Sequence, residues 1–235
     1  MASPFSSHPV LLQKKELLTF DGLTQEVKKT FIQFPDSRTG KNTKYRVEDA
    51  ALSAFSVFFL QSPSFLDYQK TMVQSQGRSN AQTWFGVHNI PGDNQIRKLL
   101  DSVAPETVFP LFWNIVDALQ KRAWLDNLRR IGGTLLVPFD GTQYFSSQKI
   151  HCEHCSTRQH QKKTTYFHQV VAPVIAAPNQ SQVIPLAPEF IQPQDGHQKP
   201  DCELNASKRW LQQWGARLSA LRVTILVPRQ LYIDG

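Results

Sequence analysis

The sequence predicts a mixed α and β fold, in which a helical N-terminal region precedes a mixed sheet. Apolar residues recur every three or four positions over most of residues 10–130, which is typical of amphipathic helices. After Gly132-Gly133 they gather instead in short runs typical of strands. A longer helical pattern precedes the last of these runs. We therefore expect a helical region over residues 1–131 and a sheet of order strand, strand, strand, helix, strand over residues 132–235.

The composition is that of an ordinary globular protein, with 235 residues, 40% hydrophobic and 19% charged. No apolar run reaches the roughly 18 residues that a membrane span needs. The first residues lack the charged start and apolar stretch of a signal peptide. We therefore expect a cytoplasmic protein with no membrane partner.

The net charge of +7 and the pI near 9.4 favour a polyanion partner, because Lys and Arg exchange counterions with phosphates. The alternative is a solvated surface that happens to be basic. Three cysteines in a cytoplasmic chain argue against a disulfide framework. Two of them lie close together, which indicates either a metal site or no special role.

In the helical region, the pattern predicts an amphipathic helix over residues 11–34 that is interrupted at Asp21-Gly22. Residues 47–60 are apolar nearly all round, so they should form the central helix. Ser62-Pro63 breaks this helix, and another helix starts within residues 65–73.

The clearest helix of the region follows Pro91-Gly92, with Asp93 as its N-cap. Its apolar face comprises Ile96, Leu99, Leu100 and Val103. The opposite face carries Arg97 and Lys98, so this helix is a candidate for reading a DNA groove. The alternative is an ordinary exposed helix face.

A last long helix should begin at Pro105 and end at Gly132-Gly133, with Arg129 and Arg130 in its final turn. Its apolar stripe comprises Phe109, Phe112, Ile115, Val116, Leu119 and Leu128.

The sheet region should contain strands over residues 134–139, 166–176, 182–186 and 222–227. The first three form a meander, and a helix over residues 201–220 crosses over to the fourth and packs on one face. This helix has an apolar stripe of Leu204, Leu211, Trp214 and Leu218. Because proline is awkward in central strands, we expect edges or bulges at Pro173, Pro185 and Pro188.

Asp140 is the first candidate functional residue. It closes the apolar run of residues 135–139 and is followed directly by Gly141, which gives close access to it. An acidic side chain at the mouth of a buried strand commonly presents a carboxylate to a metal ion. The alternative is an Asp at the end of a strand that caps the following turn.

Two sets of short motifs extend over most of residues 20–226. The helical region reads Phe34-Pro35-Asp36-Ser37-Arg38, Pro63-Ser64-Phe65-Leu66, Ile90-Pro91-Gly92-Asp93-Asn94-Gln95-Ile96-Arg97 and Leu100-Asp101. The sheet region reads Phe139-Asp140-Gly141-Thr142, Lys149-Ile150-His151-Cys152 to Cys155, and Asp195-Gly196 through Asp201-Cys202-Glu203 to Lys208-Arg209-Trp210. In this order and spacing, the chain resembles the N-terminal portion of DDE-type transposases of bacterial insertion sequences, of the group with an insertion-sequence-four-like catalytic domain.

The resemblance implies a ribonuclease H-like fold, in which three acidic residues hold two divalent ions for phosphoryl transfer on DNA. Mg²⁺ is the expected ion, because it takes carboxylate and phosphate oxygens as ligands. By its position, Asp140 matches the first acid of this triad. The resemblance also implies a bacterial, nucleoid-associated location and double-stranded DNA at element ends as the partner.

The sequence departs from the family pattern near its end. The second Asp of the triad is expected directly after residues 224–226, but the chain there reads Val227-Pro228-Arg229. Asp234 comes too late to take that role, and the Glu of the triad belongs to a segment further downstream. We therefore expect a truncated, catalytically incomplete product, and its status as an enzyme stays open.

Cys152 and Cys155 have the Cys-x-x-Cys spacing of zinc sites. The expected strand order brings Cys202 and one of the residues His168, His160 and His197 to the same rim of the sheet. We therefore expect a zinc site of Cys152, Cys155, Cys202 and a histidine, with His168 favoured. The alternative is a polar hairpin with incidental thiols.

Basic residues of the sheet region are the remaining candidates for DNA contact. Arg158, Lys162 and Lys163 lie in the long insertion after the first strand, and Lys208 and Arg209 lie on the helix face away from the apolar stripe. A solvated loop and helix surface is the alternative.

Three functions are compatible with the sequence. The first is an insertion-sequence transposase that acts in DNA transposition and recombination. The second is a non-catalytic DNA-binding remnant or regulator that forms mixed oligomers with a full-length relative; a homo-oligomer is also open. The third is a zinc-stabilised interaction module unrelated to transposition.

Overall fold

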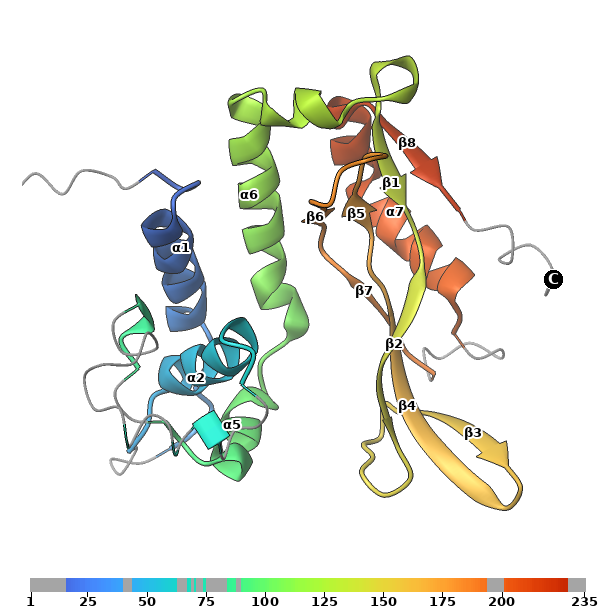
Figure 1. Cartoon of the computed structure of the whole chain (residues 1–235). Coiled ribbons are helices and arrows are strands. Elements are labelled where there is room, and N and C mark those ends of the chain that lie inside the picture. Colours follow the sequence, from blue (N-terminus) through green and yellow to red (C-terminus); the bar gives the residue numbers. More distant parts are fainter. Residues whose placement is uncertain are drawn as a thin grey trace, which may run out of the picture. The chain divides into compact units, whose positions relative to one another are not determined.

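The structure is a computed structural model that describes residues 16–39, 44–62, 67–68, 70, 74, 84–87, 90–193 and 201–227 (Figure 1). It is a mixed α+β fold that divides into two compact units, Met1–Thr107 and Val108–Gly235. Among the described helices, none is long and apolar enough to cross a membrane. The expected helix within residues 65–73 falls mostly outside the described residues.

The first unit contains α1 (Phe20–Ile32), α2 (Val47–Phe59) and α5 (Asp93–Leu100). The prediction of a central helix is confirmed, since α2 contacts both α1 and α5. Ser53 and Ser56 are fully buried in α2, where their hydroxyls donate to the carbonyls of Asp49 and Leu52 one turn earlier. This bonding lets two polar residues lie inside an apolar core.

The helix α5 has the predicted apolar face, because Ile96 and Leu99 pack on α2 residues in one buried cluster. Its N-cap is Gly92 rather than Asp93, which is instead the first helical residue. Arg97 and Lys98 are exposed, and Arg97 forms an ion pair with Asp93 at 3.2 Å.

The predicted long helix over residues 105–131 is shorter than expected. It comprises η1 (Pro105–Val108) and α6 (Phe109–Lys121), after which Ala123 adopts a left-handed conformation with φ of 57°. The chain continues as η2 (Trp124–Leu128) and η3 (Ile131–Gly133). A non-glycine residue in this conformation cannot continue an α-helix, so the helix ends nine residues before Arg130.

The helix α6 belongs to the second compact unit, which begins at Val108, whereas the sheet region was expected to begin at residue 132. Trp113 and Val116 of α6 are buried in the same cluster as Leu135 and Trp210. The predicted apolar stripe of α6 is right in part, since Phe109 and Val116 are buried, but it omitted Trp113, which is also buried. The pattern does not specify the partner of the apolar face.

The strands β1 (Leu135–Pro138) and β8 (Val223–Leu226) form a parallel pair in the register Leu135↔Val223 to Pro138↔Leu226. Leu135, Leu136 and Val137 are all buried, so both faces of β1 are covered. This matches the continuous apolar run from which the strand was predicted.

The strand β2 (Gly141–Ser147) follows β1 closely and pairs antiparallel with β4 (Lys163–Val171). The other edge of β4 pairs with β3 (Ser156–His160) near its start and with β7 (Glu189–Ile191) near its end. In Figure 1, β2, β4 and β3 extend together beyond the end of α7. The insertion after the first strand is therefore largely a sheet extension.

Two short strands, β5 (Val174–Ile175) and β6 (Ile184–Pro185), pair antiparallel beside β1, and Ala176 forms an antiparallel bridge with Leu136. The expected second strand is thus divided at Pro173 into β4 and β5. The expected third strand over residues 182–186 is reduced to the two residues of β6, and β7, which follows Pro188, was not expected. The interruption of the second strand falls at a proline, as predicted.

The helix α7 (Glu203–Leu221) has Trp210 and Leu218 buried in the core of the second unit. Trp210 lies against Phe139 and Trp113, and the Arg217 guanidinium joins α7 to α6 through Asp117 at 2.6 Å. Leu204 was expected in the apolar stripe but is 43% exposed. In the first turns of α7 it is Ala206 and Trp210 that face the core.

Candidate metal sites in the second compact unit

Asp140 follows β1 and comes directly after the buried residue Phe139. The backbone N–H of Phe139 donates to the carbonyl of Leu226 at the end of β8, and the Phe139 ring is 1% exposed. The next residue, Asp140, is exposed. This is the position that the sequence predicted for a metal-binding carboxylate.

Glu203, in the first turn of α7, is the acidic neighbour of Asp140. Its carboxyl group lies directly over the Cα atom of Gly141, where a Cβ atom on that residue would overlap it. Gly141 therefore allows the close approach of α7 to the start of β2. Glu203 was not predicted to have a role, although it is part of the Asp201-Cys202-Glu203 motif.

The two carboxyl groups interact electrostatically. Burial raises the pKa of Glu203 above its ordinary value, and the nearby negative charge of Asp140 raises it further. A cation bound between them would offset this repulsion. Among the described residues, no third His, Cys, Asp or Glu joins them to form a larger ligand group.

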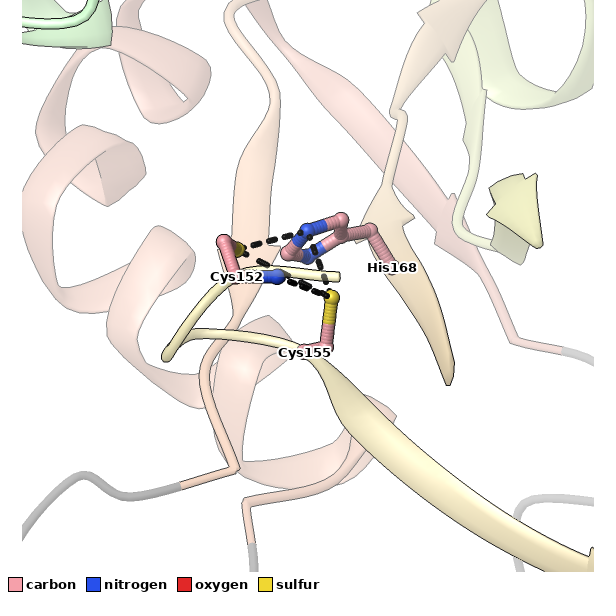
Figure 2. A group of neighbouring side chains, drawn as sticks. All are labelled: Cys152, Cys155 and His168. Atoms are coloured by element: carbon pink, nitrogen blue, oxygen red, sulfur yellow. Dashed lines mark hydrogen bonds between the residues drawn. The ribbon is translucent and has the colours of Figure 1, made fainter. Parts of the chain in front are cut away.

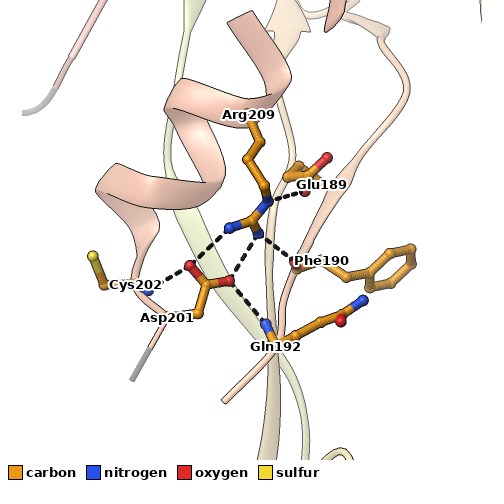
Figure 3. Close-up of polar contacts among 6 residues, drawn as sticks. All are labelled: Glu189, Phe190, Gln192, Asp201, Cys202 and Arg209. Atoms are coloured by element: carbon orange, nitrogen blue, oxygen red, sulfur yellow. Dashed lines mark hydrogen bonds and ion pairs between the residues drawn. The ribbon is translucent and has the colours of Figure 1, made fainter. Parts of the chain in front are cut away.

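The N-terminus of α7 is held in place by a partly buried ion pair (Figure 3). The Asp201 carboxylate accepts hydrogen bonds from Arg209 Nη1 at 2.9 Å and Nη2 at 2.8 Å, and from the backbone N–H groups of Gln192 and Cys202. Arg209 also donates to Glu189 Oε1 at 2.8 Å. These bonds hold the start of α7 against β7. Asp201, which accepts most of them, lies two residues before Glu203.

Arg209, a predicted DNA contact, has its guanidinium paired within the chain with Asp201 and Glu189. Burial alone would raise the pKa of Asp201, but the hydrogen bonds from Arg209 and from the two backbone N–H groups hold it below its ordinary value. The side chain of Asp201 is 0% exposed, so an ionised carboxylate there requires Arg209.

A second group of possible metal ligands lies between β2, β3 and β4 (Figure 2). It consists of Cys152, Cys155 and His168, whose ligand atoms all lie within 4.8 Å of one another. His168 Nε2 lies 3.3 Å from Cys152 Sγ and 3.4 Å from Cys155 Sγ, and the two sulfur atoms are 3.7 Å apart. The predicted proximity of these three residues is confirmed, and the set is able to hold a metal ion.

The chain around this group orients its side chains. The backbone N–H of Cys155 donates to the Cys152 carbonyl, and that of Cys152 donates to Cys155 Sγ at 3.3 Å, which closes a tight turn. The Tyr144 ring stacks on the His168 imidazole, with 5.8 Å between the ring centroids. Burial raises the pKa of the Cys152 thiol. Burial is also the main cause that lowers the pKa of His168, and the neighbouring His154 lowers it further.

Two of the expected zinc ligands are not in this group. Cys202 is the N-cap of α7 and is therefore near Gly141, which pairs with Val171 at the far end of β4. Val171 is three residues from His168 along β4, a distance of roughly 10 Å. Cys202 is therefore too far from His168 to join the group. His160 lies at the other end of the hairpin and also stays outside, while His197 lies outside the described residues.

The remaining basic candidates are on exposed surfaces. Arg158 of β3 lies over the Phe167 ring, with 5.0 Å between the guanidinium carbon and the ring centroid. Lys162 is in the two-residue turn between β3 and β4, where it has a positive φ, and Lys163 follows it. Lys208 of α7 is exposed. No family model, curated protein or solved structure matches the chain.

Proposed function

We propose that this protein is a transposase-like DNA-binding protein, in which Asp140 and Glu203 together hold a divalent ion of the kind used for phosphoryl transfer at element ends. The observation that carries this proposal is the position of the Glu203 carboxyl group over Gly141, the residue next to Asp140, where the charge of Asp140 acts on it. Mg²⁺ is the expected ion, since hard carboxylate oxygens and water are its preferred ligands. Bound there, it would polarise a phosphate oxygen.

The strand arrangement supports the ribonuclease H-like part of the proposal. The segments β1–β2, β4–β5 and β6–β7 run as three successive antiparallel strands, and α7 then crosses over to β8, parallel to β1. This is the strand, strand, strand, helix, strand order expected for that fold. Asp140 lies between β1 and β2, next to Phe139, whose backbone N–H donates to Leu226 at the end of β8.

The described residues offer two carboxylates and no third ligand at this place, which limits what they do alone. Two carboxylates can bind one Mg²⁺ and leave its other positions to water and phosphate oxygens. A pair of ions requires more negative charge than two carboxylates provide. We therefore expect this chain to bind DNA and one divalent ion without robust strand cleavage.

DNA contact is assigned to the exposed basic residues Arg158, Lys162, Lys163 and Lys208, and to Arg97 and Lys98 on α5. Phosphate contacts of this type weaken steeply as the salt concentration rises. Binding to duplex DNA that falls with salt supports the proposal. Failure to bind duplex DNA in low salt would leave a metal-stabilised interaction module as the better description.

The direct test of the proposal combines DNA binding with Mn²⁺ binding, where Mn²⁺ stands in for Mg²⁺. Wild-type protein should bind one Mn²⁺, and Asp140→Asn and Glu203→Gln should each weaken this binding. Glu106→Gln is the matched control, because Glu106 is an exposed acid of the other unit. Equal Mn²⁺ affinity in all four proteins would contradict the assignment of the site.

A further inference from the structure

We propose that Cys152, Cys155 and His168 bind one Zn²⁺ ion, and that this ion fixes the loop between β2 and β3 to β4. The proposal is independent of the Asp140–Glu203 site and of any action on DNA. Cys152 and Cys155 lie on the loop, whereas His168 lies on β4, so a single ion would join two segments that are separate in the sequence.

The spacing of the three ligand atoms matches a tetrahedral zinc ion. Zn–S bonds of about 2.3 Å and Zn–N bonds of about 2.0 Å place two sulfur atoms about 3.8 Å apart and a sulfur and a nitrogen about 3.5 Å apart. The observed separations are 3.7 Å between the sulfur atoms, and 3.3 Å and 3.4 Å from them to His168 Nε2. The side chains therefore converge on one point at bonding distance from all three.

The chemistry of the ligands selects the metal. Two thiolates and an imidazole are the ligands that Zn²⁺ takes in structural sites, whereas Mg²⁺ and Ca²⁺ take oxygen ligands. The backbone N–H of Cys152 already donates to Cys155 Sγ, and such donors support thiolate charge. The described residues supply three of the four positions of a tetrahedral ion, and the fourth is left to solvent or to another side chain.

A disulfide is the competing use of the same two cysteines. It would need the sulfur atoms to approach to about 2.05 Å, which turns them away from a shared point with the imidazole. The orientation of His168 distinguishes the two, because a disulfide gives its Nε2 atom no role. The Tyr144 ring stacked on the imidazole holds it toward both sulfur atoms.

The test is the metal content of the full chain purified without chelator, with free thiols counted in parallel. We expect about one zinc per chain. Cys152→Ser, Cys155→Ser and His168→Phe should each lose most of this zinc. The matched controls Cys202→Ser and His160→Ala should retain it, because neither residue belongs to the group.

Two further measurements keep the test decisive if a variant does not fold. Wild-type protein reconstituted with Co²⁺ should show the intense thiolate-to-cobalt absorption of a site with two sulfur ligands. His168→Cys, which replaces one zinc ligand by another, should keep the metal where His168→Phe does not. Wild-type protein without zinc, or with an oxidised Cys152–Cys155 pair as purified, would overturn the proposal, as would loss of zinc in Cys202→Ser. Asp140→Asn should not change the zinc content.

Discussion

The carboxyl group of Glu203 occupies the space over the Cα atom of Gly141 in which every other amino acid places a Cβ atom. Gly141 follows Asp140 directly, so the missing side chain of one residue allows two acids, 63 positions apart in the sequence, to become neighbours. Glycine at this position therefore has a specific role in the proposed ion site, in addition to giving access to Asp140.

The first prediction concerns Gly141→Ala. The added methyl group should displace the flexible Glu203 side chain from Asp140 and weaken Mn²⁺ binding about tenfold, or ~1.4 kcal/mol, while the chain stays folded. Because the effect acts through Glu203, Gly141→Ala should change Mn²⁺ affinity little in a Glu203→Ala background. Isothermal titration of the four proteins gives this double-mutant cycle. Additive effects would show that Gly141 acts by another route.

The second prediction concerns Glu203 and pH. Its folded-state pKa is raised by burial and by Asp140, so its favourable contribution is fully present below the unfolded pKa and is lost as pH rises through the folded value. At neutral pH, Glu203→Gln should therefore raise the free energy of unfolding, by roughly 0.5–1 kcal/mol. Urea titrations at pH 7 and pH 4 measure this. The gain should be smaller at pH 4; an equal gain at both pH values would exclude a charge effect.

Mg²⁺ should relieve the same repulsion. Saturating Mg²⁺ should raise the melting temperature of the wild-type protein, because an ion bound only by the folded state stabilises it. The increase should be much smaller in Glu203→Gln and Asp140→Asn. A similar increase in all three proteins would mean that Mg²⁺ acts elsewhere.

The third prediction concerns the Asp201–Arg209 ion pair. Arg209→Met should lower the free energy of unfolding by about 2–3 kcal/mol, less than for a fully buried pair, because the Arg209 side chain is 37% exposed. The contribution of Asp201 is present above its unfolded pKa and is lost as pH falls through its lowered folded pKa. The variant should therefore differ most from wild type near neutral pH and least in strong acid. Lys208→Met, a neighbouring exposed position, is the control and should change stability little.

The fourth prediction concerns the basic hairpin formed by β3 and β4. Replacing Arg158, Lys162 and Lys163 by Gln should weaken duplex DNA binding, because fewer phosphates are neutralised. The slope of log affinity against log salt should fall by up to about 2.7, which is about 0.9 for each of three phosphates. Lys121→Gln, an exposed change on α6, should leave the slope unchanged. Fluorescence anisotropy at several salt concentrations measures both. An unaltered slope in the triple variant would remove the hairpin from the DNA interface.

Local patterns were sufficient to predict the elements that are apolar in themselves. The helices α2 and α5 and the strands β1 and β8 follow from runs or periodicities within a few residues. The strands β2 and β3 were not predicted, because they are largely polar and exposed and owe their conformation to pairing with β4. Strand pairing between distant segments leaves little local signal.

The same distinction holds for the site residues. Asp140 was predicted because it directly follows a recognisable strand, and Cys152 and Cys155 because their spacing is itself a signal. Glu203 was missed, since only the close packing of α7 on Gly141 brings it to Asp140. Cys202 was wrongly grouped with the other cysteines, because the sequence does not give the length of strand that separates α7 from the cluster.

The central claim is that Asp140 and Glu203 share one divalent ion, and Mn²⁺ binding followed by electron paramagnetic resonance tests it most directly. We predict one Mn²⁺ site in the wild-type protein that Mg²⁺ displaces, and at least a tenfold weaker site, about 1.4 kcal/mol, in Asp140→Asn and in Glu203→Gln alike. Unchanged Mn²⁺ binding in either variant would contradict the claim.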